Sequence, residues 1–181
     1  MVSRTTALLG LGLLLGCTRS PEPTKPEPSP AASAALAMPG PSADGLSPTA
    51  QAGHRLYAVC HSCHDPELIP PKGPPMFGIQ RRYKKATDDK AAFIQRMVTF
   101  VETPDPERAV MKPAVERMGL MPALPLGQAP LEQIATYLYE AEFPAPCAHW
   151  KFAIEQDAQN PATAGDEHNR QDRMMYDKFC K

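Results

Sequence analysis

The sequence predicts an all-α fold for the folded part of this chain. Residues 49–60, 88–102 and 129–142 each carry apolar side chains at the spacing of one helix face, and no stretch alternates between polar and apolar residues as a half-buried strand does. The chain has 181 residues, a formal net charge of −1 and no block of five like charges. This charge pattern argues against nucleic acid as a partner.

The first 16 residues have the pattern of a secretory signal peptide. Arg4 is followed by a short apolar run, residues 7–15, and then by the small Gly16. The run is roughly half the length that a membrane-spanning helix needs. Its end, "LLGC", resembles the lipobox of bacterial lipoproteins, a family in which the signal is cut before the cysteine and that cysteine carries acyl chains. The resemblance implies that Cys17 is lipidated and anchors the protein on the periplasmic side of a bacterial membrane; the alternative is an ordinary cleaved signal in which Cys17 is incidental.

Residues 17–47 are predicted to form a tether. The stretch "SPEPTKPEPSP" is too rich in proline and polar residues to bury apolar surface, and a looser Ala/Ser/Gly portion follows it. A segment of this length and mixed stiffness reaches about 30 Å or more, enough to hold a domain away from a membrane. The sequence then predicts a folded domain over residues 48–143 and a C-terminal extension over residues 144–181.

Residues 60–64 read CHSCH and concentrate two of the five cysteines and two of the five histidines of the chain. Thiols of exported proteins are oxidised, metallated or covalently capped, and C-x-x-C-H is the attachment signature of c-type haem. The spacing suits this chemistry, because two thiols one helical turn apart can each add to a vinyl group of the porphyrin. We therefore predict one c-type haem, bound covalently by Cys60 and Cys63, with His64 as an axial ligand of the iron. His61 is expected to face solvent.

Two other chemistries use a C-x-x-C pair. A thioredoxin-like redox motif belongs to a βαβ setting, and no alternation of strands and helices surrounds residues 60–63. A zinc site needs a second pair of ligands at comparable spacing, and the cysteines that remain near the C-terminus are too far apart in the sequence to supply one. The haem is therefore the prediction that fits both the spacing and the export signal.

Residues 48–143 resemble a class I (mitochondrial-type) cytochrome c domain, and a single C-x-x-C-H implies a single haem. The helix predicted over residues 49–60 leads into the motif, as the N-terminal helix of that family does. The stretch "KGPPMFG" matches the family's Gly-Pro loop, in which a proline carbonyl accepts the proton of the second imidazole nitrogen and orients the proximal histidine. By position this proline is Pro74. The resemblance implies a small cytochrome c fold packed around one covalently bound c-type haem.

The last predicted helix, residues 129–142, resembles the C-terminal helix of the family, which crosses the first. The family places a small residue eight positions, and an aromatic residue four positions, before the first cysteine. Here these positions hold Ala52 and Leu56, while Gly53 and Tyr57 lie one residue later, and either pair could form the crossing. The apolar face of the last helix is formed by Leu131, Ile134, Ala135 and Leu138.

A methionine is the expected sixth ligand of the iron, because haem proteins that only transfer electrons usually have both axial positions filled. In the cytochrome c family this methionine lies in a loop, is followed by proline and precedes the last helix. Met121 has this position. The alternatives are Met111, Met118, a residue of the C-terminal tail or an open site. His149 and His168 are expected to be exposed rather than to bind the iron.

These expectations combine in a monohaem electron carrier, exported and held at the membrane by lipid and linker. Its partners would be redox proteins that donate and accept single electrons, with no small-molecule substrate. No grouping of nucleophile, base and acid indicates an enzyme. Two alternatives stay open: a haem sensor or peroxidase-like enzyme with an open sixth site, and a fixed haem subunit of a larger oxidoreductase.

The basic run "RRYKK", residues 81–85, has two interpretations. It could neutralise haem propionates, or attract an acidic partner and so steer the encounter between them. It could equally be a solvated loop.

The cysteines that lipid and haem do not use are Cys147 and Cys180, which bracket the C-terminal extension. In an oxidising compartment we expect them to form a disulfide that closes the extension and holds it against the haem domain. The alternatives are two free thiols on a frayed terminus and a bond from Cys180 to another chain.

Overall fold

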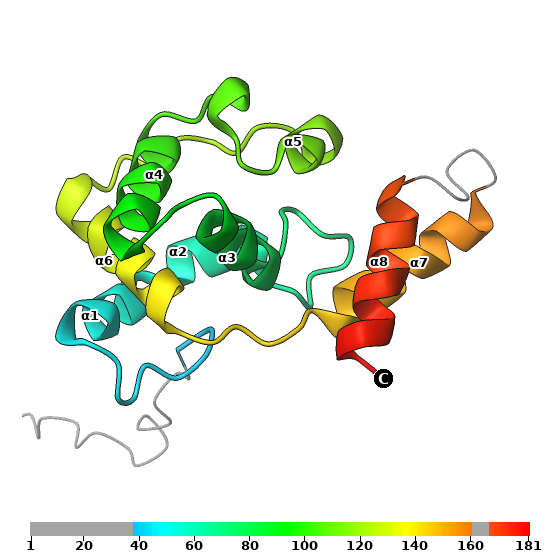
Figure 1. Cartoon of the computed structure of the whole chain (residues 1–181), viewed down its shortest axis with the longest axis horizontal. Helices are drawn as coiled ribbons and strands as arrows, with labels where there is room; N and C mark the ends of the chain where they lie inside the picture. Colours follow the sequence, from blue (N-terminus) through cyan, green and yellow to red (C-terminus); the bar gives the residue numbers. More distant parts are fainter. Residues whose placement is uncertain (1–37, 161–166) are drawn as a thin grey trace, which may run out of the picture. The chain divides into compact units, whose positions relative to one another are not determined.

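The computed structural model describes residues 38–160 and 167–181, except for the side chain of His168. The predicted signal peptide, Cys17 and most of the predicted tether lie outside these residues. Within them the chain is helical and contains no strand (Figure 1), as the sequence predicts. None of the described helices is long and apolar enough to cross a membrane. The helices are α1 (Pro48–Leu56), α2 (Ala58–His64), α3 (Met76–Lys85), α4 (Lys90–Glu102), the short 3₁₀ helix η2 (Pro106–Arg108), α5 (Lys112–Met118), α6 (Gln128–Glu140), α7 (Cys147–Gln159) and α8 (Glu167–Phe179).

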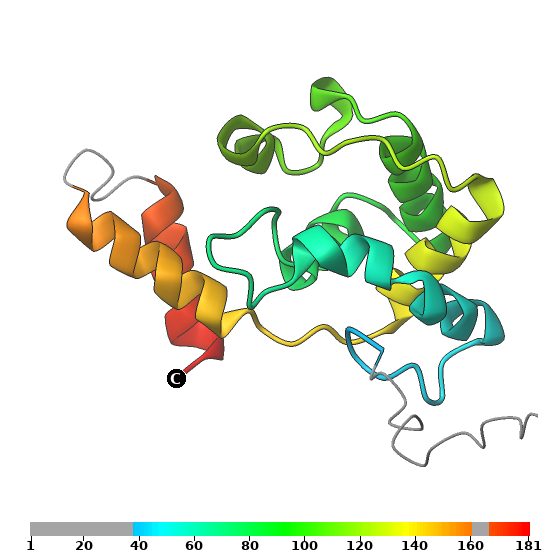
Figure 2. The same cartoon turned by 180° about the vertical axis from the view of Figure 1, so that it is seen from behind.

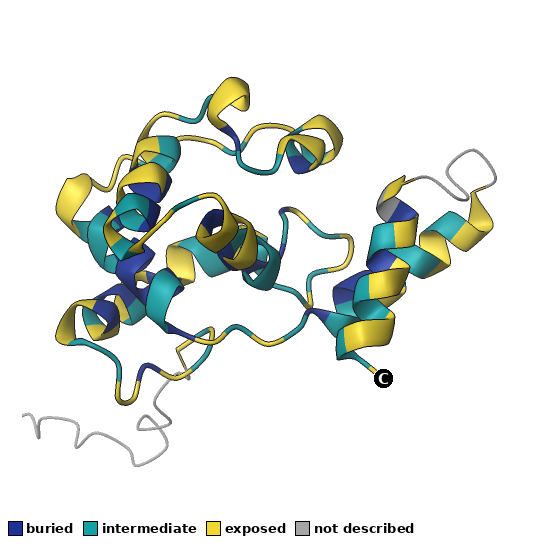
Figure 3. Cartoon of the chain, in the orientation of Figure 1, coloured by how far each residue is buried: buried dark blue, intermediate teal, exposed yellow. Residues whose placement is uncertain are grey.

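Helix α6 forms the centre of the core. It packs against α1 and α4, and Figure 3 shows buried residues gathered where these three helices meet. Full burial of a large apolar side chain contributes about 1.5–3 kcal/mol, so this interface holds together the elements that carry the candidate site. The buried face is the one that the sequence predicts, with side chains at most 4% exposed: Leu131, Ile134, Ala135 and Leu138.

The crossing of α1 and α6 depends on Gly53. A Cβ atom added there would stand 1.9 Å from the carbonyl oxygen of Gln133, so only glycine lets the two backbones come this close. One turn later Tyr57 is buried, with its ring centroid 5.3 Å from that of Tyr137. The crossing pair is therefore Gly53 and Tyr57, whereas Leu56 is 38% exposed.

The helix predicted over residues 49–60 is divided in two. Helix α1 ends at Leu56 and α2 begins at Ala58, with Tyr57 between them in right-handed helical geometry. The carbonyl of Tyr57 accepts hydrogen bonds from the amides of Cys60 and His61, at 2.9 and 3.0 Å. Helical hydrogen bonding therefore continues into the CHSCH motif. Figure 2, the view from behind, shows α2 directly after α1.

Asp89 is the N-cap residue of helix α4. The carboxylate of Asp89 accepts a hydrogen bond from an amide of the first turn at 2.8 Å, which is the usual role of an N-cap residue. Along α4, Phe93 and Met97 are buried, while Phe100 and Val101 are half-buried.

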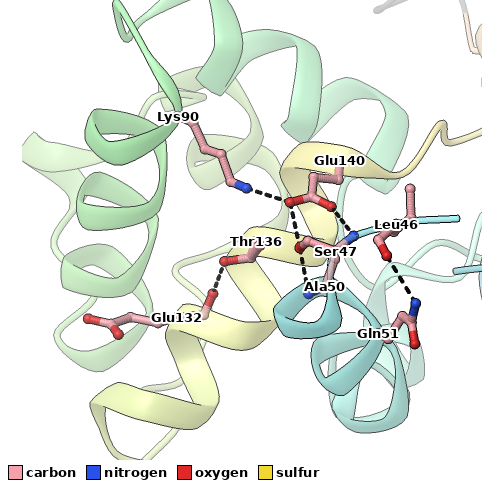
Figure 4. Close-up of polar contacts among 8 residues, drawn as sticks. All are labelled: Leu46, Ser47, Ala50, Gln51, Lys90, Glu132, Thr136 and Glu140. Carbon is pink, nitrogen blue, oxygen red and sulfur yellow. Dashed lines mark hydrogen bonds and ion pairs between the residues drawn. The ribbon is translucent and has the colours of Figure 1, made fainter.

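A polar junction around Glu140 ties the end of α6 to the starts of α1 and α4 (Figure 4). Its carboxylate accepts hydrogen bonds from the amide and the hydroxyl of Ser47, at 2.9 and 2.8 Å. It also forms an ion pair with Lys90. The Ser47 hydroxyl in turn caps α1 by accepting from the Ala50 amide at 3.2 Å. Burial alone would raise the pKa of Glu140, but the bonds from Lys90 and Ser47 outweigh it and hold the pKa below its ordinary value.

Replacing Glu140 with glutamine is expected to make the unfolding free energy less sensitive to acid. A carboxyl whose folded pKa is lowered stabilises the fold above its ordinary pKa of about 4.5, and this contribution is lost as the pH falls through the lowered value. Denaturant titrations at pH 7 and at pH 3 should therefore show a smaller difference in E140Q than in the unchanged protein. E132Q is the control, because the Glu132 carboxylate accepts an exposed hydrogen bond from Gln128 on its own helix; an equal effect of both variants would contradict the role of the junction.

The folded domain begins earlier than the sequence predicts. The boundary expected at residue 47 is wrong, because Ala43 is buried and Pro41 accepts a hydrogen bond from the hydroxyl of Tyr137 at 2.6 Å. Gly40 has a φ of 89° and lies so close to Tyr57 that an added Cβ would approach its ring to 2.7 Å. Residues 40–47 therefore pack on the core instead of continuing the tether.

The C-terminal extension is a helical hairpin. Helices α7 and α8 pack against each other, and a disulfide joins Cys147 to Cys180, with their Cα atoms 5.8 Å apart. Phe179 and Trp150 both contact the ring of Phe77 on α3, at centroid distances of 5.4 and 5.7 Å. These aromatic contacts hold the hairpin against the domain.

Removing the disulfide with the double variant C147S/C180S is expected to loosen the hairpin and to leave the core intact. Closing a loop of 33 residues stabilises by about 3–4 kcal/mol in the chain-entropy model, and the outer faces of α7 and α8 are polar and exposed (Figure 3). Hydrogen exchange should show faster exchange of the amides of α7 and α8 and unchanged protection in α4 and α6. Unchanged protection of both helices of the hairpin would contradict this.

Candidate functional site

The CHSCH motif occupies α2 and faces a cavity in the core. Cys60 is half-buried and Cys63 is exposed, both are free thiols, and both line this cavity together with His64. Because the two cysteines are three residues apart on a helix, their side chains lie one turn apart on the same face. The structure thus brings two thiols and an imidazole to one wall.

The loop before α3 fixes the orientation of His64. Its Nδ1 lies 2.7 Å from the carbonyl oxygen of Pro74, and since a carbonyl can only accept, Nδ1 carries the proton and Nε2 has a free lone pair. Gly73 allows this approach, because a Cβ atom there would stand 3.0 Å from the imidazole ring. Burial lowers the pKa of His64, although the bond to Pro74 opposes the shift. A neutral imidazole with one nitrogen held by a carbonyl is the arrangement of most metal-binding histidines.

The rest of the cavity is apolar. Its walls come from α3, α4, α5, α6 and the segment between α5 and α6, and apart from the motif the polar side chains among its lining residues are Lys72 and Tyr83. The face of α6 that packs on α1 and α4 also contributes to it. A group held by the motif would therefore meet a mostly apolar surface.

Five methionines line the cavity, among them the predicted ligand Met121. Met121 lies in the irregular segment after α5, and Gly119, with a φ of 82°, begins that segment. The alternatives line the same cavity: Met111 directly precedes α5, and Met118 is its last residue. The tail methionines do not line it: Met174 is 61% exposed. Of the methionines that the sequence analysis names as possible ligands, those that line the cavity lie on or next to α5.

The thiol of Cys60 differs from that of a redox-active C-x-x-C pair. Burial, and then the neighbouring Cys63, raise the pKa of Cys60 to about 11, whereas reactive thiols of such pairs have lowered pKa values. Among the described residues, no three or more Cys, His, Asp or Glu side chains gather as a possible metal site.

The expectation that His149 is exposed is wrong. It lies on α7 and is buried beside Trp150, because the hairpin packs against α3. His54 points to the core of the α1–α6 crossing, with its ring centroid 5.0 Å from that of Tyr137, and does not line the cavity. The side chain of His168 lies outside the described part of the structure.

Two helices that shape the cavity escaped the sequence analysis. In α3 the spacing of Met76, Ile79 and Tyr83 indicates a helix face, and residues 81–85 are the end of this helix rather than a loop. In α5 Pro113 lies in the first turn, a position that suits proline, and Ala114 and Met118 share the inner face of the helix. Both helices are short, so their periodic signal is weak.

Comparison with known proteins gives no relative: no protein-family model, curated protein or solved structure matches this chain. The interpretation of the site therefore depends on its own residues and geometry.

Proposed function

We propose that this chain is a c-type cytochrome with one haem that carries single electrons between redox proteins. The observation that supports this most strongly is the CHSCH motif with the Nδ1 of His64 bound to the Pro74 carbonyl, on the wall of an apolar cavity. Neither the motif alone nor the cavity alone would support a haem protein. Together they supply two thiols, one oriented imidazole and a dry surrounding.

The residues present fit a haem. Cys60 and Cys63 would hold it through thioether bonds, His64 would bind the iron through the Nε2 that its bond to Pro74 leaves free, and Met121, which lines the same cavity, would supply a second iron ligand. When bound, the haem supplies the reversible one-electron chemistry of its iron. The protein excludes water with its apolar walls, and the Pro74 carbonyl keeps the imidazole in one orientation.

In this proposal the protein works outside the cytoplasm. Residues 1–16 direct its export, lipidated Cys17 anchors it to a membrane, and the Pro-rich tether gives the domain reach toward its partners. The cytochrome c fold and the periplasmic location are parts of the same proposal. The protein then acts as a carrier and not as an enzyme.

Absorption spectra of the full exported chain test this proposal. The ferric and ferrous forms should both show the bands of a c-type haem with two axial ligands, and carbon monoxide added to the ferrous form should leave its spectrum unchanged. Rapid binding of carbon monoxide would contradict the carrier and favour the alternative, a haem sensor or peroxidase-like enzyme with an open sixth site. A preparation without haem bands would contradict the proposal altogether.

A further inference from the structure

A second cavity lies between α3, α5 and the α7–α8 hairpin. We call it the basic groove; its volume is about 670 Å³, far more than one small anion occupies. Its cationic side chains come from two helices, and the one acidic residue that lines it is the buried Asp172. The cations are Arg81, Arg82, Lys84 and Lys85 at the end of α3, and Arg117 near the end of α5.

The five cations have different surroundings. Arg81 lies between the rings of Phe77 and Phe179, 5.3 and 5.4 Å from their centroids, and so helps to hold the hairpin in place. The other cations on α3 include Arg82 and Lys85, which are exposed and form no ion pair with any described residue. These two are therefore available to a ligand without loss of an internal contact.

The opposite wall of the groove belongs to the C-terminal hairpin. Trp150 lines the groove from α7 and stacks edge-on against Phe77, while Met175 lines it from α8. The Cys147–Cys180 disulfide fixes the two helices to each other. The groove thus combines a cationic side with an aromatic and apolar side.

The floor of the groove is also a wall of the candidate haem cavity. Met111, just before α5, and Ala114 and Met118 within it line both cavities. Pro74, whose carbonyl accepts the hydrogen bond from His64, also lines both. A ligand in the groove is therefore separated from the cavity by a single layer of side chains. Electron transfer benefits from such closeness of partner and cofactor.

We propose that the basic groove binds an acidic segment of a partner protein. A ligand that meets cations on two helices and an aromatic wall between them needs several carboxylates and some apolar surface, and an acidic polypeptide segment has both. That this partner exchanges electrons with the haem rests on the proposed function. The binding itself depends only on the groove.

Calorimetric titration of the full exported chain with a polyglutamate peptide of about ten residues tests the groove. Binding should be measurable at low salt and should weaken as salt is added, because exposed charge pairs are screened. The double variant R82Q/K85Q should lose about two- to thirtyfold in affinity, since two exposed pairs contribute roughly 0.2–1 kcal/mol each. The control R55Q/K151Q removes the same charge from exposed positions outside the groove and should bind as the unchanged protein does.

The outcomes separate this proposal from its alternatives. An equal loss of affinity in both double variants would show that the peptide is attracted by net charge alone, and would overturn the proposal that it binds in the groove. Binding to vesicles rich in anionic lipid that depends on Arg82 and Lys85, without binding to the peptide, would assign the groove to a membrane surface instead. Peptide binding is measured without reference to the haem, so its absence in a protein with a normal haem spectrum overturns only this proposal.

Discussion

Replacing Met121 with alanine is expected to leave the haem covalently attached and to open the sixth position of its iron. The proposed thioether bonds of Cys60 and Cys63 would not involve this side chain, so haem content should not change. The ferric protein should lose its far-red methionine–iron charge-transfer band, and the ferrous protein should bind carbon monoxide readily. The reduction potential should fall, because a methionine ligand raises it.

Met118 and Met111 provide matched controls for this substitution. Both side chains line the same cavity as Met121, so M118A and M111A remove a comparable apolar contact while keeping the expected ligand. Each should retain the far-red band. If M118A or M111A loses the band and M121A keeps it, the ligand is the other methionine.

The substitution G53A is expected to destabilise the fold by about 2–3 kcal/mol or more. The added Cβ would stand 1.9 Å from a backbone carbonyl oxygen of α6, and a backbone atom cannot move aside as the end of a side chain can. Helices α1 and α6 must therefore separate, and the buried contacts of Tyr57 and Tyr137 loosen with them. Denaturant titration followed by circular dichroism measures the loss.

Gly78 is the matched control, because it too is a helical glycine. Its nearest neighbour for an added Cβ is the terminal carbon of Met111 at 3.9 Å, an ordinary contact. G78A should leave stability unchanged or raise it by up to about 1 kcal/mol, since alanine is the better helix former. Equal destabilisation by both substitutions would mean that the close crossing at Gly53 does not govern stability.

The sequence predicts the elements whose signal is local. Helices α4 and α6 have thirteen residues each and show a clear apolar period, and the face expected for α6 is buried. The CHSCH spacing and the Gly-Pro loop are also local, so the contact between His64 and Pro74 could be expected before the structure. The sequence does not decide which pair forms the helix crossing, Ala52/Leu56 or Gly53/Tyr57. Tertiary packing decides it, because Gly53 is the residue that faces the backbone of α6.

Features that depend on distant partners were missed or misplaced. Residues 40–47 pack on the core through a contact with Tyr137 in α6, and no pattern in the neighbouring sequence predicts this contact. His149 is buried because α7 meets Phe77 and its neighbours on α3, a contact between segments about 70 residues apart in the chain. Helices α3 and α5 are short, and their stability comes mainly from packing against the rest of the domain. Helix propensity alone is therefore a poor guide to where they form.

Covalent attachment of a haem to Cys60 and Cys63 is tested most directly by the mass of the denatured exported protein. The chain should keep the mass of one haem after unfolding in acid and organic solvent, conditions that extract haem held only by axial ligands. The double variant C60A/C63A should show the mass of the polypeptide without haem, and C147S/C180S should keep the haem, because its cysteines lie outside the cavity. A denatured protein with free thiols or a disulfide at Cys60 and Cys63, and no added mass, would contradict the proposal.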